Sequence, residues 1–175
     1  PLIIDNTAAP VICKPLAHGA AIVMHSLTKY IGGHGTSIGG IVVDGGNFDW
    51  IKNRKRQPLL NEPDQSYGGA IWTDAVPVLT GANIPFVIRL RVVLLRDTGA
   101  PLAPFNAWQI IQGLETVGLR MKQHCANAEK VVTFLETQKK VKNVIYPTNH
   151  QGEIKERAKK YLQGGNGALV GADLG

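Results

Sequence analysis

Aromatic side chains are scarce in this sequence, with 4 Phe, 4 Tyr and 3 Trp among 175 residues. The hydrophobic share is nevertheless 44%, because aliphatic residues supply most of it. That content is enough for a buried core, and strands rich in Val, Ile and Leu are typical of the buried sheets of α/β proteins. The length allows one domain, or one domain and part of a second.

Cysteine is rarer still, since Cys13 and Cys125 lie far apart and form no Cys-x-x-Cys pair. Two such residues exclude a disulfide-stapled fold and favour free thiols in a reducing compartment, so we expect a cytoplasmic protein. His25 and His34 have no second ligand at the spacing that metal sites use. We therefore expect hydrogen-bonded histidines there and no metal site.

Long apolar runs are also missing from the sequence. No run reaches the length that crosses a bilayer, so we expect no membrane partner. Residues 1–4 (Pro-Leu-Ile-Ile) carry neither a charged region nor a cleavage site, so we expect no secretion signal there. Strand patterns stand at both ends of the chain, and a parallel strand needs neighbours on both sides. We therefore expect an internal segment of a larger protein.

Positive charge exceeds negative charge without being concentrated. The net charge is +6, but Lys and Arg are scattered apart from residues 52–56 (Lys-Asn-Arg-Lys-Arg). Such a cluster could bind phosphate or nucleic acid, but no aromatic platform for bases accompanies it. We interpret it as a solvated helix end and loop, and we expect no nucleic-acid partner.

The hydrophobic pattern predicts alternating strands and helices. Strands are expected at residues 2–4, 20–25, 36–43, 142–146 and 168–172. Helices are expected at residues 15–18, 48–54, 85–96, 104–135 and 154–162, with a long surface loop at residues 58–69. The helix at 104–135 is much longer than average, and such a helix often joins two domains; Gly118 is its expected bend.

The most informative stretch follows the strand at residues 20–25. Ser26 and Thr28 flank Lys29 there, and a glycine-rich loop comes next. A lysine at the end of a buried strand, between two hydroxyls, is well suited to hold a phosphorylated aldehyde. Our hypothesis is that Lys29 forms a Schiff base with pyridoxal phosphate (PLP).

Asp5 ends the preceding strand. Because the carboxyl ends of parallel strands meet at one edge of a sheet, Asp5 and Lys29 are expected to lie close together. A carboxylate can keep the PLP ring nitrogen protonated, and the hydroxyls of Ser26 and Thr28 can donate to its phosphate. Taken singly, an aspartate after a strand is more often a turn residue, and a loop lysine is more often only solvated.

A nucleotide-binding loop is the alternative for residues 32–35 (Gly-Gly-His-Gly). The sequence lacks the Gly-x-x-x-x-Gly-Lys-[Ser/Thr] spacing of that loop, and a strand pattern follows instead of the required helix. The glycines therefore fit room for a cofactor better than a nucleotide loop.

Residues 5–7 (Asp-Asn-Thr) and 26–34 (Ser-Leu-Thr-Lys-Tyr-Ile-Gly-Gly-His) together resemble the Cys/Met-metabolism family of PLP enzymes, of fold type I. The two motifs stand at the separation expected for that family. Further strings are similar to its O-acetylhomoserine sulfhydrylase branch, at residues 31–44, 48–50, 62–67, 95–99 and 103–116.

The resemblance implies an α/β fold with a mixed, mostly parallel sheet covered by helices. Residues 1–117 would be the C-terminal part of the large PLP-binding domain. A long helix would lead into residues 118–175, the truncated start of a smaller α+β C-terminal domain. The family's ring-stacking tyrosine and substrate-carboxylate arginine would lie outside this sequence, and a homodimer or homotetramer is implied.

The implied reaction is a γ-replacement, in which O-acetylhomoserine and sulfide give homocysteine and acetate. By the same resemblance, Lys29 is the Schiff-base lysine, Asp5 pairs with the pyridinium nitrogen, and Ser26 and Thr28 bind the phosphate. A γ-lyase or a cystathionine γ-synthase of the same family is an alternative. An inactive segment that acts as a scaffold is another.

Overall fold

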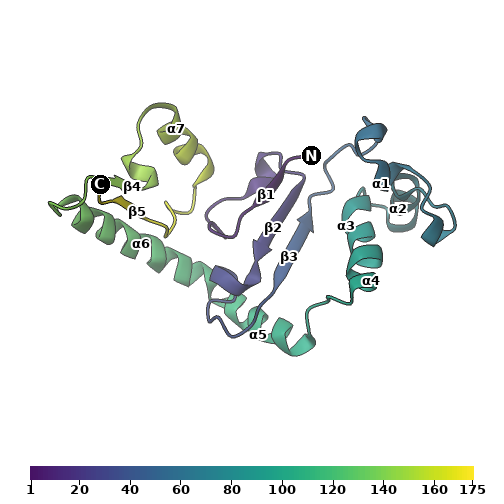
Figure 1. Cartoon of the computed structure of the whole chain (residues 1–175), viewed down its shortest axis with the longest axis horizontal. Coiled ribbons are helices and arrows are strands. Elements are labelled where there is room, and N and C mark those ends of the chain that lie inside the picture. Colours follow the sequence, from purple (N-terminus) through teal and green to yellow (C-terminus); the bar gives the residue numbers. More distant parts are fainter.

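The computed structural model describes residues 1–175 and shows a mixed α/β chain (Figure 1). A three-stranded sheet lies at its centre, with helices α1 to α4 on one side (Figure 1). On the other side the long helix α6 leads to a small second sheet and helix α7 (Figure 1). The predicted fold class, mixed α/β, is confirmed.

The central sheet has the order β1-β2-β3, formed by Ile3–Asp5, Ile22–Ser26 and Gly40–Asp44. β1 runs parallel to β2, and β3 runs antiparallel to β2. The sheet is thus mixed, but it is not mostly parallel over these strands. The strand predicted at residues 36–43 begins only at Gly40, because Gly39 and Ser37 bond to Thr28 and Gln109 instead of to a neighbouring strand.

Short helices cover one side of this sheet. They are η3 (Arg54–Arg56), α1 (Pro58–Asn61), η4 (Gln65–Tyr67), α2 (Trp72–Thr80), α3 (Pro85–Arg89), η5 (Leu90–Leu95) and α4 (Arg96–Thr98). The predicted short helix at residues 15–18, η1 (Pro15–His18), lies apart from them, and its His18 ring meets the Tyr161 ring at 4.9 Å. The helix predicted at 85–96 is confirmed as the run α3-η5-α4. Trp50, Leu60, Trp72 and Val76 form the core beneath them with Ile22.

Two predictions in this region are wrong. The helix predicted at residues 48–54 is absent except for Arg54, the first residue of η3, because the Asp49 carboxylate accepts the N–H groups of Ile51 and Lys52 and makes a turn instead. Residues 58–69 are not one surface loop, since they contain α1 and bury Leu60. Helix α2 was not predicted; it carries an internal proline, which sequence reasoning takes as a helix breaker.

The single helix predicted at residues 104–135 is in fact two, α5 (Pro104–Glu115) and α6 (Val117–Glu136). The break falls at Thr116, whose φ and ψ are −105° and 0°. Its N–H and its hydroxyl both turn back to the carbonyl of Gly113, at 3.3 Å each, which ends α5. The expected bend at Gly118 is therefore wrong.

The last third of the chain packs against α6. Strands β4 (Asn143–Ile145) and β5 (Gly171–Asp173) pair antiparallel, and η6 (Pro147–Asn149) and α7 (Gly152–Tyr161) lie between them in sequence. Both predicted strands and the predicted helix are confirmed, with shifted boundaries. Ala128, Val132, Val144 and Tyr146 form a separate small core there.

Each helix of this chain is too short or too polar to span a bilayer by itself. Only α2 and the run from Pro85 to Thr98 reach that length and hydrophobicity together, and they are bent by 100° relative to each other.

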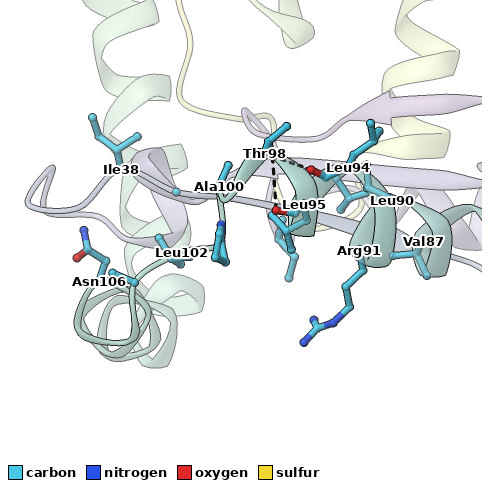
Figure 2. Close-up of a pocket in the computed structure, with 16 residues that line it drawn as sticks. Ile38, Val87, Leu90, Arg91, Leu94, Leu95, Thr98, Ala100, Leu102 and Asn106 are labelled. Carbon is cyan, nitrogen blue, oxygen red and sulfur yellow. Dashed lines mark hydrogen bonds between the residues drawn. The ribbon is translucent and has the colours of Figure 1, made fainter. Parts of the chain in front are cut away.

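A cleft of about 900 Å³ lies between β3 and the run α3-η5-α4 (Figure 2). Its walls are mostly apolar, with Leu90, Leu94 and Leu102 among them. Thr98 lines its edge and donates its hydroxyl to the Leu94 carbonyl at 2.6 Å. None of the four predicted site residues lines this cleft, so the cleft and the predicted site are different places.

Candidate active site

Lys29 lies in η2 (Leu27–Ile31), one wide helical turn that begins directly after β2. Its φ and ψ of −87° and −123° interrupt the helix, and its side chain is exposed and makes no hydrogen bond or ion pair within the chain. The turn is closed by the N–H of Gly32 on the Leu27 carbonyl and the N–H of Gly33 on the Lys29 carbonyl, each at 2.8 Å. The amine is therefore free to react.

The end of β1 is tied to the start of this turn. Asp5 stands opposite Met24 in the parallel register, so both strand ends reach the same edge of the sheet. The N–H of Asn6 donates to the Met24 carbonyl at 2.9 Å, and the N–H of Ser26 donates to the Thr7 hydroxyl at 2.7 Å. The predicted approach of Asp5 to the lysine turn thus has a backbone basis. Its role toward a cofactor stays a prediction.

The Asp5 carboxylate is exposed and hydrogen-bonded to Thr7. Hydrogen bonds from the side chain and from the backbone N–H of Thr7 lower the pKa of Asp5, with a smaller effect from His25. Asp5 is therefore ionised at neutral pH. An ionised carboxylate is what a protonated pyridine nitrogen requires as its partner.

Ser26 and Thr28 differ in how their hydroxyls are used. The Ser26 hydroxyl has no partner within the chain and is half-buried. The Thr28 hydroxyl accepts the N–H of Gly39 at 3.0 Å and lies 3.3 Å from the Gly39 carbonyl, to which it donates. A hydroxyl has only one proton to give, so Thr28 must rotate before it can donate to a phosphate. Both phosphate roles stay predictions.

His25 is half-buried on β2, and its Nδ1 atom is buried without a hydrogen-bond partner. Burial lowers the pKa of His25, and the nearby charge of Asp5 partly opposes that shift. His25 is thus neutral at physiological pH. The sequence predicted a hydrogen-bonded histidine here, which is wrong for Nδ1.

The pKa of His25 makes stability depend on pH. Below its usual pKa of 6.5 the unfolded chain binds a proton that the folded chain resists, so the free energy of unfolding falls as the pH falls toward the lowered pKa. We expect His25→Gln to unfold at more similar urea concentrations at about pH 5 and about pH 8 than the wild type does. An unchanged pH difference would show that His25 contributes nothing to it.

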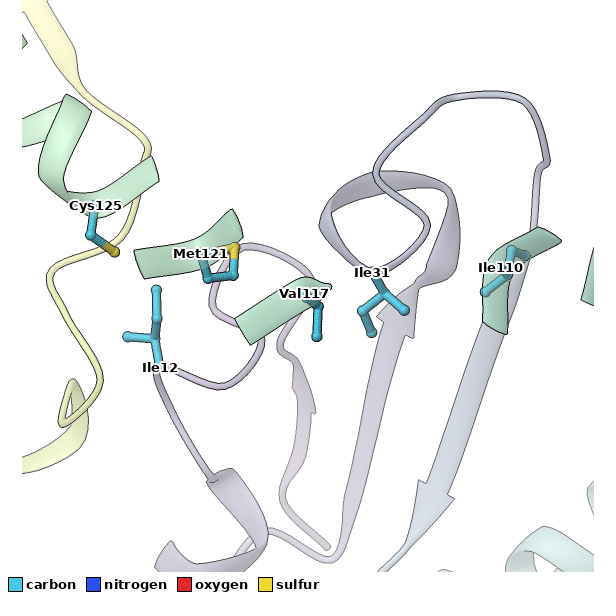
Figure 3. Packing of buried hydrophobic residues seen from close by; sticks show 6 residues of the cluster. All are labelled: Ile12, Ile31, Ile110, Val117, Met121 and Cys125. Carbon is cyan, nitrogen blue, oxygen red and sulfur yellow. The ribbon is translucent and has the colours of Figure 1, made fainter. Parts of the chain in front are cut away.

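The apolar core beneath η2 comes from four parts of the chain (Figure 3). Its members are Ile12, Ile31, Ile110, Val117, Met121 and Cys125. Ile31 is the anchor that follows Lys29 by two positions, and it is only 9% exposed. The lysine turn is therefore held on one side by packing while Lys29 itself faces outward.

Two residues near the site were missed as functional residues. Thr7 belongs to the predicted Asp-Asn-Thr motif, but only the structure shows that it bonds both Asp5 and Ser26. Arg120 reaches the carbonyls of Tyr30 and Ile31 from helix α6. No local sequence signal could find Arg120, because the contact spans about half the chain.

Comparison with known proteins identifies the family. The model of the "Cys/Met metabolism PLP-dependent enzyme" family matches residues 1–174. The chain belongs to this family. The resemblance of the Asp-Asn-Thr and Ser-x-Thr-Lys motifs is thus confirmed, and PLP is the cofactor of the Cys/Met metabolism enzymes.

Relatives within the Cys/Met metabolism family cluster around one activity. O-acetyl-L-homoserine sulfhydrylase of Leptospira meyeri is 47% identical over 99% of this chain and 40% of its own length. A solved structure is similar as well, that of a putative O-acetylhomoserine (thiol)-lyase from Campylobacter jejuni with a pyridoxyl-lysine phosphate. It aligns with a TM-score of 0.83 and 38% identity, over 98% of this chain and 42% of its own length. The chain therefore spans about two-fifths of the length of these relatives.

A more distant family member has the same fold. Cystathionine gamma-lyase from Lactobacillus plantarum aligns with a TM-score of 0.68 and 30% identity, over 99% of this chain and 35% of its own. Its TM-score and its identity are both lower than those of the O-acetylhomoserine (thiol)-lyase structure, so of these two structures the (thiol)-lyase is the more similar to this chain.

The residues present fit PLP. The cofactor needs an amine for its aldehyde, a carboxylate for its ring nitrogen and donors for its phosphate. The chain offers the free amine of Lys29, the ionised carboxylate of Asp5 and the unpaired hydroxyl of Ser26 around one sheet edge. His25, next to Ser26 in β2, has a buried Nδ1 without a hydrogen-bond partner.

Proposed function

We propose that the full-length protein containing these residues is a PLP-dependent transferase that converts O-acetylhomoserine and sulfide into homocysteine and acetate. The observation that carries this proposal is the placement of Asp5 and Lys29 at the ends of two adjacent parallel strands, in a chain 47% identical to an O-acetyl-L-homoserine sulfhydrylase. In the net reaction the Cγ–O bond of the substrate breaks, acetate leaves, and a Cγ–S bond forms.

Each predicted site residue has its own role in this reaction. When bound, PLP supplies an electron sink for the substrate Cα. The Lys29 amine would hold the cofactor aldehyde and, when free, would act as the base that takes the Cα proton of the substrate. Lys29 then moves protons between Cα and Cβ, which allows acetate to leave from Cγ. Asp5 holds the proton on the ring nitrogen, and Ser26 with Thr28 orients the phosphate.

The activity itself can be tested with the full-length protein and O-acetylhomoserine, with and without sulfide. The proposal predicts homocysteine and acetate in equal amounts only when sulfide is added. A γ-lyase is the second candidate, favoured by the fold shared with cystathionine gamma-lyase. It would release an α-keto acid and ammonia without sulfide, and that result would replace the proposal.

Asp5→Asn tests the carboxylate. Opposite charges in contact shift a pKa by about 1–3 units, so loss of this charge should lower the protonated fraction of the ring nitrogen, and kcat/KM, by about 10- to 1,000-fold. The assay is homocysteine formation in the full-length enzyme. Asp5→Glu, which keeps the charge, should lose less. Equal activity of Asp5→Asn and the wild type would show that Asp5 has no role in the active site.

The proposal for the full-length protein also includes its domain division, its oligomeric state and its compartment. A division into residues 1–117 and 118–175 is supported by the separate small core of α6 and β4. A homodimer or homotetramer is supported by strongly exposed apolar side chains such as Val78 and Leu79 on α2. A reducing, cytoplasmic setting is supported by two free cysteines.

A further inference from the structure

The guanidinium of Arg120 connects helix α6 to the backbone just after Lys29. Its Nη1 donates to the Tyr30 carbonyl at 2.6 Å, and its Nη2 donates to the carbonyls of Ile31 and Gly113 at 3.0 and 2.8 Å. Its Nε donates to the Thr116 hydroxyl at 3.1 Å. One side chain thus joins η2, the end of α5 and the start of α6.

Two of these carbonyl acceptors lie at the end of η2, whereas the third, the Gly113 carbonyl, also accepts the N–H and the hydroxyl of Thr116. Tyr30 and Ile31 close η2, where the last carbonyls of a helical segment lack intrahelical donors. Gly113 lies in the last turn of α5, where a positive charge is also favourable. Because the donors point to separate carbonyls, the planar fork of arginine suits the site, whereas the single ammonium of lysine does not.

Glycines bring the backbones close enough for this arrangement. A Cβ on Gly33 would lie 2.6 Å from the Arg120 guanidinium carbon, and Gly33 has a φ of +75°. A Cβ on Gly113 would lie 2.1 Å from the Gly32 carbonyl oxygen. Only glycine at these two positions lets the backbone of residues 32 and 33 lie this close to α5 and to Arg120.

We propose that Arg120 is a positioning residue for Lys29. It does not contact the lysine side chain; it holds the carbonyls of Tyr30 and Ile31, the two residues after Lys29, and through this backbone it fixes the direction in which the Lys29 side chain leaves the turn. The proposal rests on the proposed function, in which that amine must meet both the cofactor aldehyde and the substrate Cα. A displacement of about 1 Å in such a group can cost about 100-fold in rate.

Arg120→Met and Arg120→Lys in the full-length protein test this role. Both variants should show at least about tenfold faster hydrogen exchange in the peptide covering residues 27–35, because its backbone is no longer held. Both should lower kcat by about 100-fold with a smaller change in KM, and should shift the visible absorbance of the lysine-bound cofactor. Arg120→Lys keeps the positive charge, so the same measurements can be made on it if Arg120→Met does not fold.

Arg157→Met is the matched control, because it removes an arginine whose only ion pair is an exposed one within α7. It should leave exchange, absorbance and kcat unchanged. If both Arg120 variants lose thermal stability but keep wild-type exchange at residues 27–35 and wild-type kcat, Arg120 only attaches α6 and the proposal is wrong. Hydrogen exchange of cofactor-free protein decides whether Arg120 holds the backbone even if the wild type proves to be a γ-lyase.

Discussion

Replacing Lys29 with alanine in the full-length protein is expected to remove the visible absorbance of lysine-bound PLP and nearly all activity. Lys29 is the free amine at the end of β2, and its side chain has no structural partner to lose. The loss of a positioned base alone costs about 100- to 10,000-fold. The absorbance scan and the rate of homocysteine formation measure the two effects separately.

Lys52→Ala is the matched control for this experiment, since Lys52 is also exposed and belongs to the basic cluster outside the site. It should keep both the absorbance and the rate. Persistence of the visible band in Lys29→Ala would mean that another lysine holds the cofactor, and the assignment of the active site would then be wrong.

Gly113→Ala is expected to destabilise the protein by about 2 kcal/mol, although alanine is normally the better helix former by about 1 kcal/mol. The added Cβ would meet the Gly32 carbonyl oxygen at 2.1 Å, and neither can rotate away, since the Cβ position is set by the helix backbone and the oxygen belongs to the main chain. Helix α5 must then move off the lysine turn. Urea unfolding of the variant and wild type measures the loss.

Gly118→Ala, on the next helix, is expected to stabilise the protein and serves as the comparison for Gly113→Ala. A Cβ there meets nothing within 4 Å, and Gly118 lies inside α6. This variant should gain about 0.5 kcal/mol, because alanine restricts the unfolded chain. If Gly113→Ala were stabilised to the same extent, the close approach of α5 to Gly32 would not exist in solution.

Sequence reasoning succeeded where a few neighbouring residues decide the outcome. The strands around Asp5 and before Lys29 were predicted because short apolar runs and their polar ends are local signals. The family followed from the same two motifs, since the positions of Asp5, Ser26, Thr28 and Lys29 are fixed by spacing alone.

The failures share a different physical origin. The break at Thr116 depends on hydrogen bonds to Gly113 that only the folded turn creates, whereas the apolar spacing continues through it. Leu60 is buried by a tertiary contact with Trp50 and Trp72, so its polar surroundings were misleading. The contact of Arg120 with the lysine turn could not be predicted, because Tyr30 lies 90 positions earlier in the sequence.

The hydrogen bond between Arg120 and Tyr30 spans 90 positions of sequence. During translation, the strands and the lysine turn are made first, and the arginine that holds the turn follows only after those 90 further residues. At about 5–20 residues per second this interval lasts roughly 5–20 seconds. If Arg120 positions Lys29 as proposed, the lysine turn stays unheld for these seconds, and we expect cofactor capture in a defined geometry only after α6 has emerged.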